Sequence, residues 1–333
     1  MVVVNDNTTY VVDAHCDTLI RLKTYGLDKF AESPNQICVS LPRLRQGGVR
    51  VQWFAVFVES EFAYGMPLHR SLELVDLYWR MVKNYSNDLM PVNSREDIER
   101  MMALGRIGTI LSLEGGEALQ GSLAILRNFY RLGVRSICLT WNRRNYLGDG
   151  VGETGQGAGL SNFGRAVIRE MNALGMIIDV SHLGERSFWE AIELSQSPVI
   201  ASHCNCRALA DHPRNLTDEQ IKAIAELGGV IGVTFVPEFL HTSAPNLEHV
   251  FEHIDHICQV AGPNCAGIGS DFDGTDNYLP ALRSPASFGL LEEGLKKRGY
   301  SQTDIGKILG GNFLRVLSQV LPSDQIQGVP NAG

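Results

Sequence analysis

Residues 176–203 have the sequence MIIDVSHLGERSFWEAIELSQSPVIASH, and this stretch decides the fold class. Two short apolar runs, 176–182 and 199–203, flank a segment, 185–194, whose apolar residues recur at helical spacing. A strand, a helix and a second strand in succession predict a parallel β-α-β unit. Both runs end on a serine followed by a histidine, so His182 and His203 are expected at the same edge of one sheet.

The same alternation extends to both sides of this unit. Eight apolar runs qualify as buried strands: 10–17, 49–58, 107–114, 134–141, 176–182, 199–203, 229–235 and 266–271. Helical patterns lie at 68–85, 95–103, 122–132, 162–174, 185–194, 218–227 and 247–260. Eight such units predict an α/β fold of the (β/α)8 TIM-barrel type. A doubly wound open sheet is the alternative, but no Gly-x-Gly-x-x-Gly motif follows the first strand to support it.

Helix boundaries and the chain's end refine this architecture. Ser94 before Asp97 and Thr217 before Gln220 are typical of helix N-caps. Glycines at 105, 133, 175 and 228 suit left-handed helix ends. Patterns at 287–298, 302–309 and 311–321 predict closing helices, so we expect one domain over residues 1–333 with these helices from about 286. The glycine-rich stretch 148–159 either covers the site or is a plain flexible loop.

Composition excludes several classes of partner. The chain has 333 residues, 44% hydrophobic, and a net charge of −8 without a basic cluster, which argues against nucleic acid or a membrane as partner. There is no run of 18 apolar residues and no basic leader before an apolar segment. Seven scattered cysteines predict buried free thiols rather than disulfides. We therefore expect a cytoplasmic protein, and a homodimer is compatible with these features.

Metal-ligand residue types fall where the predicted strands end, which in a barrel is the active-site face. The run 10–17 ends with His15 and Asp17, whose side chains point the same way because strand residues alternate. Glu114 ends the run 107–114, and its two oxygens could bridge two ions or form an ion pair at the mouth. Together with His182 and His203, these donors predict a site for two Zn²⁺ ions.

Two carboxylates follow the last strand. Asp271 ends the apolar stretch and is favoured as the group that takes a proton from the attacking water and passes it to a leaving amine. Asp273 is expected to cap the following turn. The site as a whole predicts amide hydrolysis by a hydroxide held between two zinc ions.

The sequence resembles the membrane (renal) dipeptidase family of zinc peptidases, among the amidohydrolase-like barrels. The resemblance spans nearly the whole chain and is carried by six motifs: VDAHCD (12–17), EGG (114–116), DVSH (179–182), SH (202–203), GSDFDG (269–274) and GNFLRV (311–316). It implies a metalloprotease acting on dipeptides, with a binuclear zinc site, Glu114 as the bridging ligand and Asp271 as the proton-handling carboxylate.

The resemblance also implies a substrate site and shows one departure. The segment 211–215, DHPRN, resembles the family's stretch with an arginine for the dipeptide's terminal carboxylate, which makes Arg214 the candidate. The family often has Leu-Thr-His after the fourth strand, whereas this chain has Leu-Thr-Trp-Asn. Trp141 or Asn142 is therefore expected to take part of the histidine's role in contacting the substrate, unless the substrate range differs.

Other interpretations stay open from the sequence. A related binuclear amidohydrolase could act on N-acyl amino acids, cyclic amides or lactones, although the fourth strand lacks the bridging lysine that many of these enzymes use. A third hypothesis is a barrel that binds metal but has lost catalysis, and Trp141 in place of the family's histidine is the only feature that favours it. His249, His253 and His256 share a helix, but the apolar stripe beside them predicts structural or exposed roles.

Overall fold

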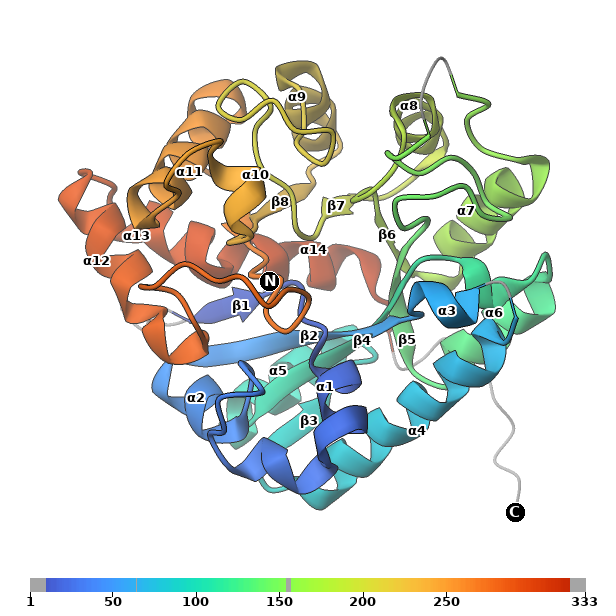
Figure 1. Cartoon of the computed structure of the whole chain (residues 1–333), viewed down its shortest axis with the longest axis horizontal. Coiled ribbons are helices and arrows are strands. Elements are labelled where there is room, and N and C mark those ends of the chain that lie inside the picture. The colour runs from blue at the N-terminus through green and yellow to red at the C-terminus, as the bar shows by residue number, and fades with distance from the viewer. Residues whose placement is uncertain (1–9, 64, 154–156, 324–333) are drawn as a thin grey trace.

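Eight parallel strands close into a barrel with helices around it (Figure 1). The computed structural model describes residues 10–63, 65–153 and 157–323. Closure is made by β2, which pairs with β1 on one side and with β4 on the other. The barrel strands are β1 (Val11–Asp13), β2 (Val49–Phe57), β4 (Ile107–Glu114), β5 (Val134–Cys138), β6 (Ile177–Asp179), β7 (Ile200–Ala201), β8 (Val230–Val233) and β9 (Ala266–Ile268). All eight predicted strands are confirmed, and the open sheet is wrong.

A ninth strand was not predicted. β3 (Leu89–Pro91) pairs in parallel with the start of β4, next to the place where β5 joins the same edge. It has three residues and ends on a proline, which cannot donate to the ladder. So short a segment leaves no periodic pattern in the sequence.

Helices follow the strands and cover the outside of the barrel (Figure 1). The predicted helices are confirmed within one or two residues at each end. They are α4 (Pro67–Asn84), α5 (Arg95–Leu104), α6 (Leu123–Arg131), α7 (Asn162–Leu174), α8 (Glu185–Leu194), α9 (Asp218–Glu226) and α11 (Leu247–Ala261). Short elements were missed: α1 (Thr18–Tyr25), η1 (Leu27–Ala31), α2 (Leu41–Gln46), α3 (Ser60–Ala63), η2 (Glu117–Leu119), α10 (Pro237–Leu240) and η3 (Pro285–Ser287).

Local signals at the helix ends are also confirmed. Ser94 with Asp97, and Thr217 with Gln220, form reciprocal capping boxes at the starts of α5 and α9. The C-cap glycine after α7, Gly175, adopts φ 68°, a left-handed conformation that favours glycine. These contacts satisfy helix-end groups that would otherwise lack partners.

Four helical segments end the described part of the chain: α12 (Gly289–Lys297), α13 (Gln302–Gly306), the π-helical turn η4 (Lys307–Gly311) and α14 (Asn312–Val320). Of these, η4 and α14 contact β1, β8 and β9 and close the bottom of the barrel. The predicted break near Gly310 is wrong, because α13, η4 and α14 follow one another directly. Glycine is needed there for close packing, since a Cβ on Gly310 would lie 2.5 Å from the backbone oxygen of Tyr10. Phe313 packs against Trp53 inside the barrel, with ring centroids 5.7 Å apart.

The stretch 148–159 is tied down in the part that the structure describes. The Asp149 carboxylate accepts hydrogen bonds from the backbone N–H groups of Ala158 and Gly159. The N–H of Val151 donates to the backbone oxygen of His182 over 2.8 Å. This stretch therefore packs against the loop after β6 and stabilises it. Residues 154–156 lie outside the described ranges.

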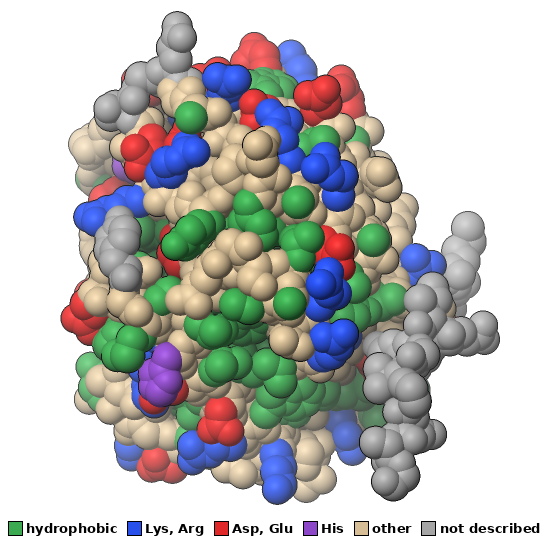
Figure 2. Space-filling view, turned by 90° about the vertical axis from the view of Figure 1, so that its right-hand side faces the viewer, with side chains coloured by type: hydrophobic (Ala, Val, Ile, Leu, Met, Phe, Trp, Pro, Cys, Tyr) green, Lys and Arg blue, Asp and Glu red, His purple; other side chains and the backbone are tan. Residues whose placement is uncertain are grey.

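The surface carries charges of both signs. On the side that faces right in Figure 1, acidic and basic side chains are intermixed and apolar side chains gather across the lower half (Figure 2). A homodimer stays a prediction, and an apolar area of this kind is a feature that a subunit contact would use. None of the helices in the described part of the chain has the length and apolar character needed to span a bilayer. All seven cysteines lie in the described ranges and are free thiols.

One histidine of α11, His253, has a structural role, because it links the loop after β7 to the end of α10 through hydrogen bonds to their backbones. His253 is buried, its Nδ1 accepts the backbone N–H of Cys206 at 3.0 Å, and its Nε2 lies 3.0 Å from the Leu240 carbonyl oxygen. Burial lowers the pKa of His253 to about 4, so the ring is neutral at pH 7. The stability that depends on the neutral ring is present above about pH 6.5 and is lost as the pH falls through 4.

His253→Leu is expected to lower the free energy of unfolding by about 2–4 kcal/mol, because two buried backbone groups lose their partners. Urea unfolding followed by circular dichroism measures the change. His69→Leu is the matched control, since the side chain of His69 is 68% exposed, and should change stability by less than about 0.5 kcal/mol. Equal stability of the two variants would contradict the structural role of His253.

Candidate metal centre and substrate cavity

The five predicted metal ligands and the predicted proton carrier Asp271 lie together at the carboxyl ends of the strands. Glu114 is the last residue of β4, and the others come just after β1, β6, β7 and β9. The five predicted metal ligands are no more than 6% exposed, and the Asp271 side chain is 14% exposed. The barrel therefore gathers residues that are up to 256 positions apart onto one rim.

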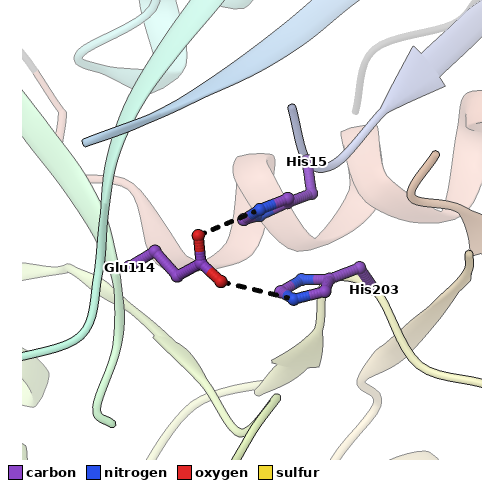
Figure 3. A group of neighbouring side chains, drawn as sticks. All are labelled: His15, Glu114 and His203. Atoms are coloured by element: carbon purple, nitrogen blue, oxygen red, sulfur yellow. Dashed lines mark ion pairs between the residues drawn. The ribbon is translucent and has the colours of Figure 1, made fainter. Parts of the chain in front are cut away.

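Glu114 occupies the centre of this cluster. Its Oε2 lies 3.4 Å from His15 Nε2, while Oε1 lies 3.1 Å from His182 Nε2 and 3.7 Å from His203 Nε2. Figure 3 shows the carboxylate with one oxygen directed to His15 and the other to His203. Asp17 Oδ2 lies 3.6 Å from His15 Nε2. Each oxygen of Glu114 thus faces a different set of donors, as a bridging carboxylate would.

Several polar atoms of the cluster have no hydrogen-bond partner among the described residues. His15 Nε2 and Asp17 Oδ1 are buried and unsatisfied. Two groups of donors, each within 4.8 Å, could hold an ion: His15, Glu114 and His203, and His15, Asp17 and Asp271. Unsatisfied buried donors of these types are explained by a bound cation.

The two histidines that follow β6 and β7 also indicate a bound cation. His182 Nδ1 lies 2.7 Å from Asn142 Oδ1, which can only accept, so Nδ1 carries the hydrogen. His203 Nδ1 lies 2.7 Å from Ser202 Oγ, whose own hydrogen goes to the Asp179 carboxylate. Both Nε2 atoms are therefore lone-pair acceptors, yet they lie only 2.8 Å apart. A cation between or beside them would remove this repulsion.

The backbone at the rim is strained. His182 and Asp271 have φ angles of 65° and 63°, in a left-handed region that residues other than glycine seldom adopt. Such strain is held in place by surrounding structure and clusters at functional sites. At this rim it turns the side chains of both residues toward the centre of the barrel mouth.

Without a cation, burial and mutual repulsion disfavour the charged forms of the carboxylates in the cluster. Burial, together with repulsion from Asp17, raises the pKa of Glu114 to about 8. Burial also raises the pKa of Asp271 to about 6 and lowers the pKa of His203 well below its usual range. Burial opposes a charge on His15, but the nearby Glu114 and Asp17 carboxylates raise its pKa well above 6.5. Positive charge from metal ions would favour the ionised carboxylates.

Asp271 and Asp273 have different surroundings. Asp271 Oδ1 lies 3.9 Å from His15 Nε2, and its side chain lines the cavity above the cluster. Asp273 instead accepts hydrogen bonds from the N–H groups of Cys38 and Val39 and from the Thr18 hydroxyl. The expectation that Asp273 caps its own turn is wrong, because it ties α1 and the distant loop at 38–39 together.

A cavity of about 580 Å³ opens above the donors and is of a size suited to a small ligand. Arg214 lies in its wall, buried, with its guanidinium 5.6 Å from the Phe239 ring centroid. Its NH2 donates to the His203 carbonyl oxygen, and its NH1 lies 3.5 Å from Cys204 Sγ. Arg214 forms no ion pair among the described residues, and its Nε is unsatisfied. This buried cation can bind an anionic group.

Trp141 and Asn142, the predicted substrate-contacting residues, also line this cavity, and their contact with a substrate stays a prediction. Trp141 lies between Phe57 and His182, with ring centroids 5.4 Å and 6.2 Å away. Asn142 makes its hydrogen bond to His182, so it also orients a metal-ligand candidate.

Sequence reasoning missed the residues that orient the donors. Asp179 accepts a hydrogen bond from the Ser202 hydroxyl and so fixes the tautomer of His203. Asp13 accepts hydrogen bonds from the N–H and the hydroxyl of Ser270, next to Asp271. A signal was present, because both aspartates interrupt otherwise apolar strands two or three residues before a donor.

A barrel with these donors at its mouth, below a cavity with a buried arginine in its wall, is typical of metal-dependent hydrolases. The profile of the membrane dipeptidase family, peptidase family M19, matches residues 6–326. The chain belongs to this family and is a metallopeptidase of the dipeptidase type.

Individual relatives agree with this assignment. Dipeptidase verJ of Clonostachys rogersoniana is 32% identical over 291 residues, which cover 84% of this chain and 75% of that protein. The structure of dipeptidase AC, a family M19 metallopeptidase, superposes with a TM-score of 0.89 at 27% identity and covers 95% of this chain and 100% of that one. A Rhodobacter sphaeroides metallopeptidase, solved with a phosphinate mimic of the dipeptide L-Ala-D-Ala, gives 0.87 at 26% identity, covering 94% and 100%.

Proposed function

We propose that this chain hydrolyses dipeptides with a free terminal carboxylate, using two zinc ions held by His15, Asp17, Glu114, His182 and His203. The observation that carries the proposal is the position of Glu114, whose oxygens face different histidines. In this arrangement His15 and Asp17 would hold one ion, His182 and His203 would hold the other, and Glu114 would serve as a ligand to both. When bound, the ions would supply electrophilic activation of the amide and of the attacking water.

The chain's own residues supply the remaining steps. Arg214 binds the dipeptide's carboxylate and so places the peptide bond over the donor cluster. Asp271, whose side chain lines the cavity above the donor cluster, accepts a proton from the attacking water and gives it to the leaving amine. Trp141 and Phe57 cover one side of the cavity with apolar surface and limit access of other water.

A panel of dipeptides tests the proposal. The zinc-loaded protein should hydrolyse L,L- and L,D-dipeptides, including L-Ala-D-Ala, the dipeptide whose mimic is bound in the Rhodobacter sphaeroides relative. N-acyl amino acids, cyclic amides and lactones serve as the comparison set. If the protein hydrolysed only members of the comparison set, its substrate would be another amide or an ester, and the dipeptide proposal would be wrong.

Arg214→Met is expected to raise KM for dipeptides roughly 10- to 100-fold with a smaller change in kcat, because charge-assisted hydrogen bonds to the substrate are lost. The matched test uses dipeptide amides, which lack the carboxylate. The wild type should strongly prefer the acid over the amide, and the variant should not. If the variant kept the full preference, Arg214 would not be the carboxylate-binding residue.

A further inference from the structure

A second cavity adjoins the substrate cavity and shares the Trp141 wall with it. It has a volume of about 380 Å³ and is lined in part by Val58, Ser60, Ala63, Trp141, Arg143 and Tyr146. We call it the side cavity. We propose that the side cavity receives the side chain of the dipeptide's amino-terminal residue and gives the enzyme a preference for large apolar, above all aromatic, side chains at that position. This inference rests on the proposed function.

The order of strands around the barrel gives the direction of the bound dipeptide. The ring runs β1, β2, β4, β5, β6, β7, β8 and β9, so β2 lies across the mouth from β7. Arg214 follows β7, and Phe57 and Val58 end and follow β2. If the carboxylate lies at Arg214 and the peptide bond at the donor cluster, the amino-terminal residue extends toward β2. The side cavity begins there, at Val58 and Trp141.

The walls of the side cavity indicate the kind of side chain it accepts. Val58 and Ala63 are apolar, and the aromatic rings of Trp141 and Tyr146 complete the surface. Aromatic side chains pack favourably on such rings in stacked or edge-on contacts. The volume far exceeds what an alanine side chain fills, so a small residue would leave much of the cavity to water.

Charges in the lining do not favour a charged side chain. Arg144 is paired with Asp149, and Glu117 accepts a hydrogen bond from Asn145 at 3.3 Å. Burial raises the pKa of Glu117, which weakens its tendency to carry a charge. Arg143 is exposed, so its guanidinium is solvated and its charge is screened. The apolar walls therefore dominate the recognition.

Trp141 is the residue that the two cavities share, because its ring bounds both of them. By the family resemblance, it stands at a position where a histidine is often found. An indole offers one N–H donor but a much larger apolar surface than an imidazole. The exchange gives up polar contact with the substrate and provides a surface for stacking.

The test compares kcat/KM for L-Phe-L-Ala, Gly-L-Ala and Gly-L-Phe in the zinc-loaded enzyme. We expect L-Phe-L-Ala to exceed Gly-L-Ala roughly 10- to 100-fold, as burial of one aromatic side chain allows. Ser60→Phe places a ring in the side cavity and should bring that ratio close to one, while the ratio of Gly-L-Phe to Gly-L-Ala stays as in the wild type. Ala63→Phe should act in the same way from the same wall.

Glu61→Phe is the matched control, because Glu61 lies on the same turn, is exposed and does not line the side cavity. It should keep the wild-type ratio. Unchanged ratios in both Ser60→Phe and Ala63→Phe, with circular dichroism spectra like the wild type, would overturn the proposal but leave dipeptide hydrolysis intact. A lack of turnover for every dipeptide would overturn the proposed function and this inference together.

Discussion

Glu114→Gln is expected to reduce kcat/KM by about 1,000-fold or more and to lower the metal content of the protein. The glutamine is nearly the same size but is neutral, and its nitrogen is not a metal ligand. Metal ions stabilise several kcal/mol of developing charge in such reactions, which corresponds to a loss of about three orders of magnitude. Because the Glu114 oxygens face His15 on one side and His182 and His203 on the other, a single change affects both sets of donors.

Metal analysis and steady-state kinetics on the same preparation measure this effect. Glu193→Gln is the control, since Glu193 is exposed on α8 and the loss of one surface carboxylate should leave both quantities unchanged. Full metal content and activity in Glu114→Gln would show that Glu114 is an ion-pair partner at the barrel mouth and not a ligand.

Asp271→Asn is expected to lower kcat by about 100- to 10,000-fold while leaving the metal content unchanged, because the asparagine cannot accept and pass on a proton. The backbone contacts should persist, since the N–H of residue 271 donates to the His15 carbonyl oxygen whatever the side chain. Substrate binding should also persist, so KM should change much less than kcat.

Asp271→Glu separates the proton-transfer role from packing. A carboxylate one methylene longer should recover part of the activity that Asp271→Asn loses. If both variants lost metal together with activity, Asp271 would be a ligand. If Asp271→Asn were fully active, the proton would be carried by another group.

The fold was accessible from the sequence because buried parallel strands are continuous apolar runs. Runs such as 107–114 and 266–271 stand out without any alignment. The predictions overran most strand ends: β7 comprises Ile200–Ala201, where 199–203 was expected. The residues beyond the strand leave the ladder because they turn their side chains toward the rim, as the left-handed backbone of His182 shows.

The metal-ligand candidates were also predicted, although one argument behind them was wrong. His15 and Asp17 were placed on one face of a strand by alternation, but β1 ends at Asp13. Asp17 stands at the N-cap of α1 and reaches the cluster from there. Their roles as ligands, and the assignment of residues 1–333 to a single domain, stay predictions.

Other parts of the site could not be predicted because they depend on loops meeting in space. The hydrogen bond from His182 to Asn142 joins the loops after β6 and β5. The side cavity brings α3, η2 and the loop after β5 together. No periodic pattern encodes such contacts, since loop residues follow local turn chemistry and not the spacing of a strand or helix.

The most direct test of this account is to count the zinc ions bound per chain as activity toward L-Ala-D-Ala returns to metal-free protein. We expect activity to be absent without metal and to reach its maximum when two ions are bound per chain. Full activity in protein that contains no metal, or saturation at one ion per chain, would contradict a pair of ions shared through Glu114.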